Sequence, residues 1–229
     1  MAEMILIDEP ARWTSFDVVA KIRGAARRIS GDKKIKVGHA GTLDPFATGL
    51  MIVLVGKNNT SKQASFMKQD KEYLATMKLG YLSTSGDPEG EITQYHPDNL
   101  LIDGQKITKE KILQVFSQYL GSIEQTPPIF SAVKIAGQRA YKLARAGKVP
   151  EMKSRQVFIY SLELVSYDFP ELAFRVKCSS GTYVRSLAQD IGQDLGCGGY
   201  LAGLRRTMIG DYHISDAVTI EEALKSMED

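Results

Sequence analysis

The chain has 229 residues, of which 43% are hydrophobic and 24% charged, a composition that can fill the core of a large globular domain. No apolar run approaches the roughly 20 residues that a membrane-spanning helix needs, which argues against an integral helical membrane protein. The two cysteines lack a CxxC spacing, so they indicate neither a disulfide scaffold nor a zinc site, and we expect a reducing cytoplasm.

The net charge of +2 hides two strongly basic segments. Residues 21–36 carry seven Lys or Arg against one acid, Asp32, and residues 134–155 carry seven against Glu151 alone. Two such segments predict a positively charged face for a polyanion. Solvated, lysine-rich surfaces would give the same pattern, so charge alone leaves both interpretations open.

Hydrophobic periodicity predicts the elements of the first half of the chain. Thr14 with Asp17 three residues later forms a capping-box pattern at a helix start. The expected elements are, in chain order, a strand at 4–7, a helix at 16–29, a strand at 51–55, a short helix at 60–68, a strand at 73–79 and a loop at 83–90.

In the second half, apolar and polar residues alternate along 172–178, as they do in a half-buried strand. Thr219 with Glu222 gives a second capping box. Because several strands follow one another, the pattern predicts an α+β fold with a mixed, largely antiparallel sheet. The expected elements are a helix at 107–120, an excursion at 126–152 with a helical pattern at 141–146, strands at 157–167 and 172–178, a helix at 184–195, a short helix around 201–206 and a final helix after Thr219.

One carboxylate, Asp44, lies in a loop of small residues at 38–49, and no other acid occurs between Asp32 and Asp70. Glycine reaches positive φ and proline fixes φ, so this backbone is shaped to present a side chain. Such a carboxylate can act as a nucleophile or a base. Asp-Pro and nearby glycines are also ordinary turn signals, so the loop alone does not distinguish a structural turn from a catalytic loop.

Three further features accompany this loop. Tyr73 opens a strand, Arg185 lies in the first turn of a helix that follows a strand, and Arg205 and Arg206 end the expected short helix. Taken singly, each has a structural interpretation: an aromatic residue at the edge of the core, or a surface cation. Their combination carries the functional interpretation.

In this order, the blocks resemble the TruB family of tRNA pseudouridine synthases, and the resemblance covers nearly the whole chain. The blocks that carry it are Leu6–Pro10, Trp13–Ser15, Asp17–Val19, Gly38–His39, Gly41–Pro45, Ala47–Gly49, Thr126–Pro128, Ser131–Lys134, Gly181–Arg185 and Leu204–Arg206.

The resemblance implies a role for each matching residue. Asp44 would be the catalytic aspartate, Tyr73 the tyrosine that packs on the target base, and Arg185 the arginine that pairs with the aspartate. Leu204 would line the uracil pocket, and His39 would stack in the RNA loop beside the flipped base. The other residues expected to contact RNA are Gly41, Thr42, Lys62, Lys134, Lys142 and Arg145.

The resemblance also implies the pseudouridine synthase fold, with residues 1–229 as one catalytic domain and a basic, RNA-clamping thumb at about 126–152. Family members usually carry a further C-terminal RNA-binding domain. The chain up to Asp229 leaves little room for it, so we expect no separate C-terminal domain. The implied partner is the T-arm stem-loop of tRNA, with no membrane partner, no metal and no organic cofactor, and we expect a monomer.

The implied reaction breaks the glycosidic bond of a uridine in the TΨC loop and rejoins the uracil through C5. A carboxylate nucleophile divides this into two easier steps, and its attack on C1′ or on C6 stays open. The target base must first flip out of its stack. A non-catalytic chaperone that folds tRNA and a synthase acting on another RNA are the alternatives, and Asp44, Tyr73 and Arg185 together favour the enzyme.

Overall fold

The computed structural model describes residues 4–95, 101–102 and 105–228. Their contacts gather into two compact units, the first made of Met1–Leu74 with Leu204–Asp229 and the second of Ala75–Gly203. The chain passes between the units within strands β4 (Lys71–Leu79) and β14 (Gly199–Ile209). The expected single catalytic domain stays a prediction.

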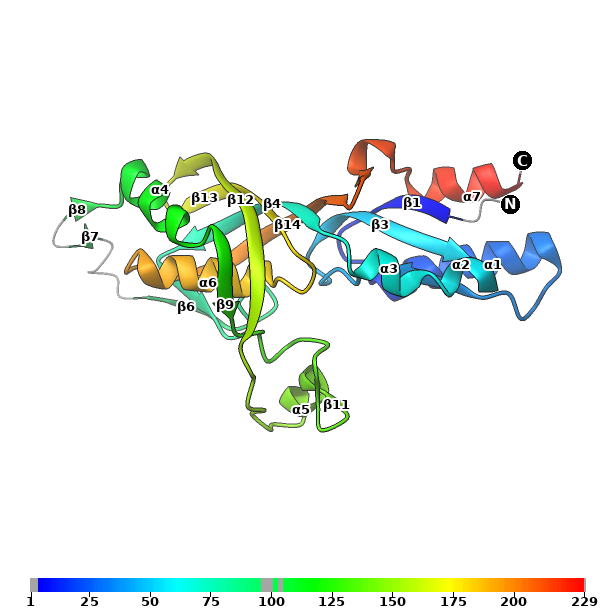
Figure 1. Ribbon diagram of the computed structural model, residues 1–229, viewed down its shortest axis with the longest axis horizontal. Helices are drawn as coiled ribbons and strands as arrows, with labels where there is room; N and C mark the ends of the chain where they lie inside the picture. Colours follow the sequence, from blue (N-terminus) through cyan, green and yellow to red (C-terminus); the bar gives the residue numbers. More distant parts are fainter. Residues whose placement is uncertain (1–3, 96–100, 103–104, 229) are drawn as a thin grey trace. The chain divides into compact units, whose positions relative to one another are not determined.

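In the first unit, strand β3 is the centre of the sheet. It lies between β1 and β14 (Figure 1), pairing antiparallel with β1 and β2 and parallel with β14, where Arg206 is opposite Gly49. The remaining elements of this unit are β1 (Met4–Glu9), α1 (Ser15–Ser30), β2 (Val37–Ala40), β3 (Thr48–Val55), α2 (Lys57–Thr60), α3 (Gln63–Met67), β15 (Tyr212–His213), the 3-10 turn Ile214–Asp216 and α7 (Ile220–Glu228).

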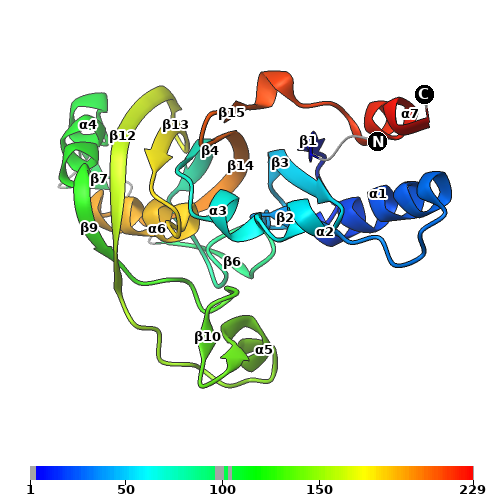
Figure 2. The ribbon, with the colours of Figure 1, turned by 45° about the vertical axis from the view of Figure 1, so that its right-hand side comes forward.

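Strand β3 is buried on both faces, which explains its continuous apolar run. Successive side chains of a strand point to opposite faces. Met51 and Val53 therefore join one core cluster with α1 and α7 (Figure 2), while Leu50 and Ile52 join another with Ile209. Because β3 begins at Thr48, this buried strand fixes the position of the end of the small-residue loop.

Both helix starts predicted from capping boxes are confirmed. The Thr14 side chain accepts a hydrogen bond from the Asp17 N–H while Asp17 bonds back to Thr14, and Thr219 and Glu222 make the same exchange before α7. Gly31, with a φ of 70°, ends α1 in the left-handed region, where glycine is favoured.

The second unit has the strand order β4-β13-β12-β9, and β12 runs antiparallel to both β13 and β9. Together with the first unit, this confirms the mixed, largely antiparallel sheet flanked by helices. The other elements are β5 (Tyr81–Ser83), β6 (Ile92–Gln94), β7 (Leu101–Ile102), β8 (Gln105–Lys106), α4 (Lys109–Gln118), β9 (Gly121–Gln125), β10 (Lys134–Ile135), β11 (Gln138–Arg139), α5 (Ala140–Arg145), β12 (Arg155–Asp168), β13 (Glu171–Cys178) and α6 (Val184–Asp194).

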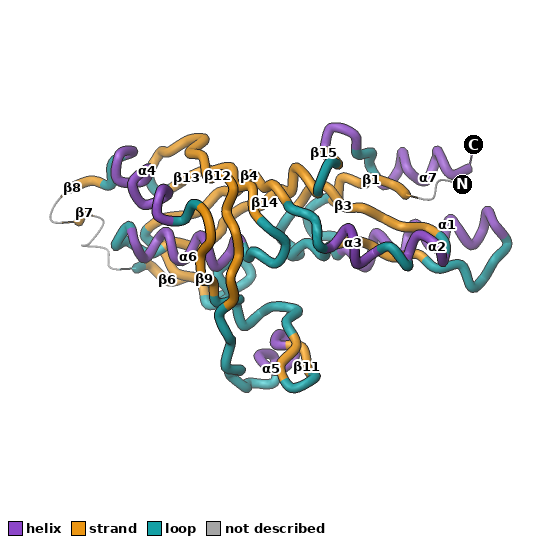
Figure 3. The backbone as a smooth tube through the Cα atoms, in the orientation of Figure 1, coloured by secondary structure: helices purple, strands orange, loops and turns teal. Residues whose placement is uncertain are grey.

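Strand β13 buries every second residue, as its alternation predicts, and Cys178 is a buried core thiol. Phe174 on this strand meets Phe116 of α4 edge to face, with ring centroids 5.8 Å apart. Between β9 and β12 the chain leaves the sheet as the expected excursion, which carries the β10–β11 hairpin and α5 (Figure 3). We call residues 126–152 the thumb.

The short helix predicted around 201–206 is wrong, because these residues belong to strand β14. The spacing of Leu201, Leu204 and Arg205 matches a helix turn, but pairing with β3 decides the conformation. The predicted helix at 60–68 is divided into α2 and α3. None of the helices formed by the described residues is long and apolar enough to cross a bilayer.

Candidate active site

Asp44 lies half-buried in the loop that joins β2 to β3. Glycines with positive φ flank the loop, Gly41 at 99° and Gly49 at 113°. A Cβ atom on Gly49 would fall 2.4 Å from the carbonyl oxygen of Arg206, so only glycine fits there. The Ala47 N–H donates to the Asp44 carbonyl oxygen over 2.9 Å and closes a turn around the carboxylate.

The buried guanidinium of Arg206 connects the two ends of this loop. Its Nη2 donates to the carbonyl oxygen of Gly41 over 3.0 Å, and its Nε donates to that of Leu50 over 2.7 Å. Only 2% of Arg206 is exposed. Hydrogen bonds from a charged, buried group are stronger than neutral ones, so Arg206 fixes where the loop begins and where it ends.

A second connection reaches the middle of the loop from α1. The Leu43 N–H donates to Ser15 Oγ over 3.1 Å, and the Ser15 hydroxyl lies 2.9 and 3.0 Å from the carboxyl oxygens of Glu9. Glu9 is fully buried, and burial raises its pKa to about 7 although the Ser15 hydrogen bond and the charge of Arg206 oppose the rise. The residue before Asp44, Leu43, therefore has its backbone N–H fixed by a buried side chain.

His39 lies near the same guanidinium, and Leu204 lies on the same strand as Arg206. Burial and the charge of Arg206 lower the pKa of His39, which favours the neutral imidazole. Leu204 precedes Arg206 by two residues on β14, so both side chains lie on one face of that strand. The structure thus places Gly41 and His39 close to Arg206 and puts Leu204 on the same face of β14, while the gathering of these residues around Asp44 stays a prediction.

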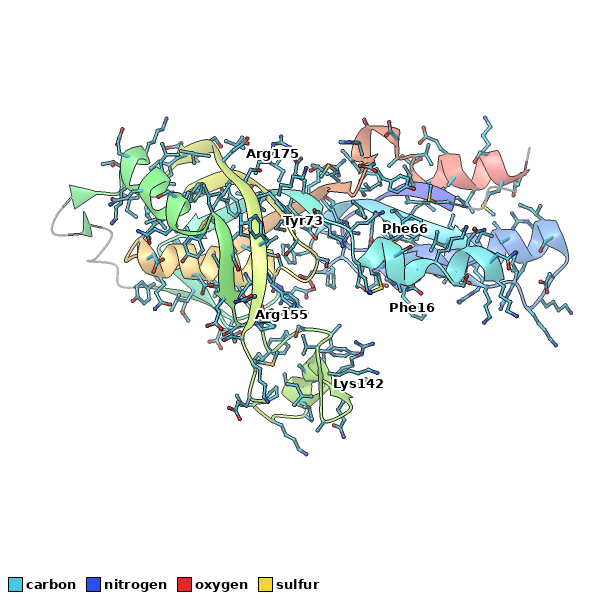
Figure 4. All side chains as sticks on the ribbon, viewed as in Figure 1. Phe16, Phe66, Tyr73, Lys142, Arg155 and Arg175 are labelled. Atoms are coloured by element: carbon cyan, nitrogen blue, oxygen red, sulfur yellow. The ribbon has the colours of Figure 1, made fainter. Side chains whose placement is uncertain are left out.

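Tyr73 lies half-buried on β4 (Figure 4), close in sequence to two polar contacts that fix the start of the strand. The Lys71 ammonium donates to the carbonyl oxygens of Met67 and Gln69, over 2.6 and 2.5 Å, at the end of α3. Thr207 of β14 donates to Glu72 over 2.8 Å. Lys62, at the start of α3, is exposed.

In the second unit, Arg185 lies in the first turn of α6, as predicted, and its side chain is 4% exposed. Its Nη1 pairs with the buried carboxylate of Asp87 at 3.1 Å and also donates to the Ser85 carbonyl oxygen over 3.2 Å. Its Nη2 donates to the Phe130 carbonyl oxygen over 2.9 Å. The pairing of Arg185 with Asp44 involves both units and stays a prediction.

The thumb is attached at both ends to residues 181–186, which we call the anchor segment. Where the thumb begins, Gln125 exchanges two hydrogen bonds with the Tyr183 backbone, 2.8 and 3.1 Å long, and Ser186 donates to the Thr126 carbonyl oxygen over 2.8 Å. Where it ends, Arg155, labelled in Figure 4, donates to the Gly181 carbonyl oxygen and stacks over the Tyr183 ring.

The three thumb cations expected to contact RNA are exposed: Lys134, Lys142 and Arg145. Figure 4 shows Lys142 on the thumb, and Arg145 lies on the same short helix, α5. Thr42 is exposed at the loop beside Asp44. Exposed cations on an excursion from the sheet are suited to phosphate contacts that need no deep pocket.

Sequence reasoning gave no supporting role to four buried polar residues: Glu9, Ser15, Asp87 and Arg206. A signal existed for Glu9, because the alternation of Ile5, Ile7 and Glu9 puts its carboxyl on the apolar face of β1. The sequence gives no such signal for Asp87, because the surrounding segment has the composition of an ordinary turn. Within the described ranges, no group of three or more His, Cys, Asp or Glu residues gathers as metal ligands.

Comparisons with known proteins agree over most of the chain. Residues 27–184 match the model of the TruB family pseudouridylate synthase N-terminal domain, and residues 185–228 match that of the tRNA pseudouridylate synthase B C-terminal domain. The chain is similar to proteins called tRNA pseudouridine synthase B from Phocaeicola vulgatus, at 46% identity over 96% of this chain and 90% of the relative, and from Parabacteroides distasonis, at 47% over 96% and 91%.

Two solved structures share the fold. The chain is similar to one in a Cbf5-Nop10-Gar1 complex, with a TM-score of 0.69 and 28% identity, and to one in an H/ACA RNP bound to a substrate RNA containing 2′-deoxyuridine, with a TM-score of 0.66 and 26% identity. The matches cover 97% of this chain but 53% and 52% of those chains, so it spans about half their length. These matches confirm the resemblance drawn from the sequence blocks.

Proposed function

We propose that this chain, which belongs to the TruB family of pseudouridylate synthases, converts a uridine in the T arm of tRNA to pseudouridine in the cytoplasm, as a monomer. The names of relatives that match over nearly their whole length support tRNA as the substrate. A fold shared with a chain solved on a substrate RNA supports RNA binding. The observation that carries the proposal is one carboxylate, Asp44, in a loop held by Arg206 and Ser15.

The chemistry suits a carboxylate and needs no electron donor. The N1–C1′ bond breaks, the uracil turns, and a C5–C1′ bond forms while C5 loses a proton and N1 gains one. Asp44 serves as the nucleophile, which divides the reaction into two easier steps. Arg185, placed against Asp44, would keep the carboxylate ionised, because an opposite charge lowers a carboxyl pKa.

The remaining site residues hold the flipped base. Extruding a nucleotide costs a few kcal/mol, and stacking on an aromatic or imidazole face returns about 1–3 kcal/mol per base. Tyr73 and the neutral imidazole of His39 supply those faces, and Leu204 supplies an apolar wall. The small residues Gly41 and Thr42 let the nucleotide approach the carboxylate closely.

RNA binding by the thumb and by the basic segment at 21–36 would be electrostatic. Lys62, Lys134, Lys142 and Arg145 would contact phosphates of a folded stem-loop, which proteins recognise mostly by shape. Affinity should therefore fall steeply with salt. A tRNA-folding chaperone could use the same cations, but it would not require the buried support beneath Asp44.

The test incubates the purified protein with an unmodified T-arm stem-loop and measures pseudouridine formation. We expect turnover by the wild type and a loss of at least about 1000-fold for Asp44→Asn, because the nucleophile is removed. RNA affinity should change little, since the substitution leaves the phosphate contacts in place.

Asp211→Asn is the matched control, because Asp211 is an exposed acid of the same unit and has no part in the site. Full activity of Asp44→Asn would refute the catalytic assignment. RNA binding and refolding without any pseudouridine would favour the chaperone. Turnover on a different stem-loop but none on the T arm would favour another RNA as substrate.

A further inference from the structure

We propose that Glu9 is a positioning residue of the active site: through Ser15 it holds the backbone N–H of Leu43 and so fixes the loop that presents Asp44. The inference rests on the proposed function of Asp44. Glu9 lies at the end of β1, hydrogen-bonded to Ser15 at the start of α1, and is not among the residues expected to touch RNA.

The chain of contacts is short and buried. Glu9 is 0% exposed and Ser15 1% exposed. Ser15 Oγ lies within 3.0 Å of both carboxyl oxygens of Glu9 and accepts the Leu43 N–H over 3.1 Å. Leu43 is itself buried and immediately precedes Asp44. One hydroxyl group therefore separates Glu9 from the backbone of the loop.

A serine hydroxyl has one proton and two lone pairs, which gives this chain a direction. When Glu9 is ionised, it can only accept, so the Ser15 proton points to Glu9 and a lone pair faces the Leu43 N–H. When Glu9 is protonated, its own O–H competes as a donor to Ser15 Oγ. The ionised form thus favours the arrangement that holds the loop, because charge-assisted hydrogen bonds are the stronger ones.

Several charged groups surround Glu9. Arg206 on β14 attracts its negative charge, and Asp17 on α1 repels it. Asp8, Arg205 and Glu221 line the pocket of about 420 Å³ that Glu9 also borders. Burial dominates and raises the Glu9 pKa to about 7, so the carboxyl changes its charge near neutral pH.

The test compares three variants of the full chain across about pH 6 to about pH 8. Ser15→Ala removes the link, Glu9→Gln keeps the size and the acceptor but cannot titrate, and Glu221→Gln changes an exposed acid beside the same pocket. We expect Ser15→Ala to lower kcat about tenfold or more with little change in KM for RNA. We expect the fall of wild-type kcat below about pH 7 to be absent in Glu9→Gln and retained in Glu221→Gln.

A second readout does not depend on activity. Hydrogen exchange at the Leu43 amide should become faster in Ser15→Ala than in wild type, while the Val53 amide of β3 stays protected. Fluorescence of Trp13, the single tryptophan of the chain, reports whether each variant is folded.

Unchanged kcat and unchanged Leu43 exchange in Ser15→Ala would overturn the proposal, as would an acid limb of kcat that persists in Glu9→Gln. If wild-type protein makes no pseudouridine, the proposed function fails, and the exchange rates still decide whether Ser15 holds the loop. Loss of protection at both Leu43 and Val53 would also count against the proposal, because the role would then be general to the unit.

Discussion

The Asp44 loop and the thumb are both irregular segments, yet they are held in opposite ways. Buried side chains hold the loop: Arg206 binds its two ends and Ser15 its middle. The thumb is hydrogen-bonded to the rest of its unit near its start, at Thr126 and Phe130, and where it rejoins the sheet, and its cations are exposed. A reacting group must be placed accurately, because an error of about 1 Å can lower the rate about 100-fold, whereas phosphate binding tolerates movement.

The largest expected effect is the loss of folding stability in Arg206→Met, which removes the buried support of the Asp44 loop. The substitution leaves two carbonyl oxygens without their donor and the buried carboxyl of Glu9 without its positive neighbour. We expect the free energy of unfolding to fall by about 3–5 kcal/mol, the cost of breaking a buried charged network from one side. Urea unfolding followed by circular dichroism measures it.

The neighbouring arginine provides the control. Arg205 pairs with Asp8 at 2.7 Å, but the two side chains are 40% and 33% exposed, so Arg205→Met should cost no more than about 1 kcal/mol. Combining Arg206→Met with Glu9→Gln should recover part of the loss, since the uncompensated carboxyl is then absent. If Arg206→Met and Arg205→Met lower the free energy of unfolding equally, the buried contacts of Arg206 contribute no more stability than an exposed ion pair.

The next largest effect is a pH dependence of folding stability that arises from Glu9. The pKa of Glu9 is raised to about 7 in the folded protein from an ordinary value near 4.5, so the folded state holds its proton longer than the unfolded state. Stability from this group is full below about pH 4.5 and is lost as pH rises to about 7, by on the order of 3 kcal/mol. Glu9→Gln cannot lose this contribution.

Unfolding free energies of wild type and Glu9→Gln at several pH values between about 5 and 8 give the difference directly, because the other acids titrate in both proteins. The free energy of unfolding of Glu9→Gln should increase relative to that of the wild type as pH rises. A difference that stays constant over this range would show that Glu9 keeps one charge state, and the description of the loop support would need revision.

The smallest effect is expected in the thumb. Lys142→Ala with Arg145→Ala should weaken RNA binding and reduce the slope of log affinity against log salt by roughly 1.5, about 0.7–0.9 for each lost phosphate contact. Stability should hardly change, because both side chains are exposed. Fluorescence anisotropy with a labelled T-arm stem-loop at increasing salt measures the slope.

Lys109→Ala with Lys225→Ala removes the same charge from exposed positions on α4 and α7, outside the thumb. Its slope should match the wild type. If both double variants reduce the slope equally, net charge rather than the thumb explains binding.

The sequence predicted most elements because local signals and tertiary contacts agreed. The capping boxes at Thr14 and Thr219 and the alternation along β13 all formed as expected. The helix expected around Leu204 failed because pairing with β3 overrides a short helical spacing. Asp44 could be named as a candidate from its loop together with the other sequence blocks, while its support from Glu9 and Arg206 depends on residues that are about 35 and 160 positions away and meet only in the fold.

The thumb enters and leaves through the anchor segment, with Gln125 and Ser186 at one end and Arg155 at the other. The thumb is therefore a loop whose two ends are both bound to the anchor segment. Lengthening such a loop adds little closure entropy, since the cost grows only with the logarithm of its length. The part of the thumb beyond Phe130 can therefore change in size or charge while Arg185 keeps its hydrogen bonds to Ser85 and Phe130 and its ion pair with Asp87.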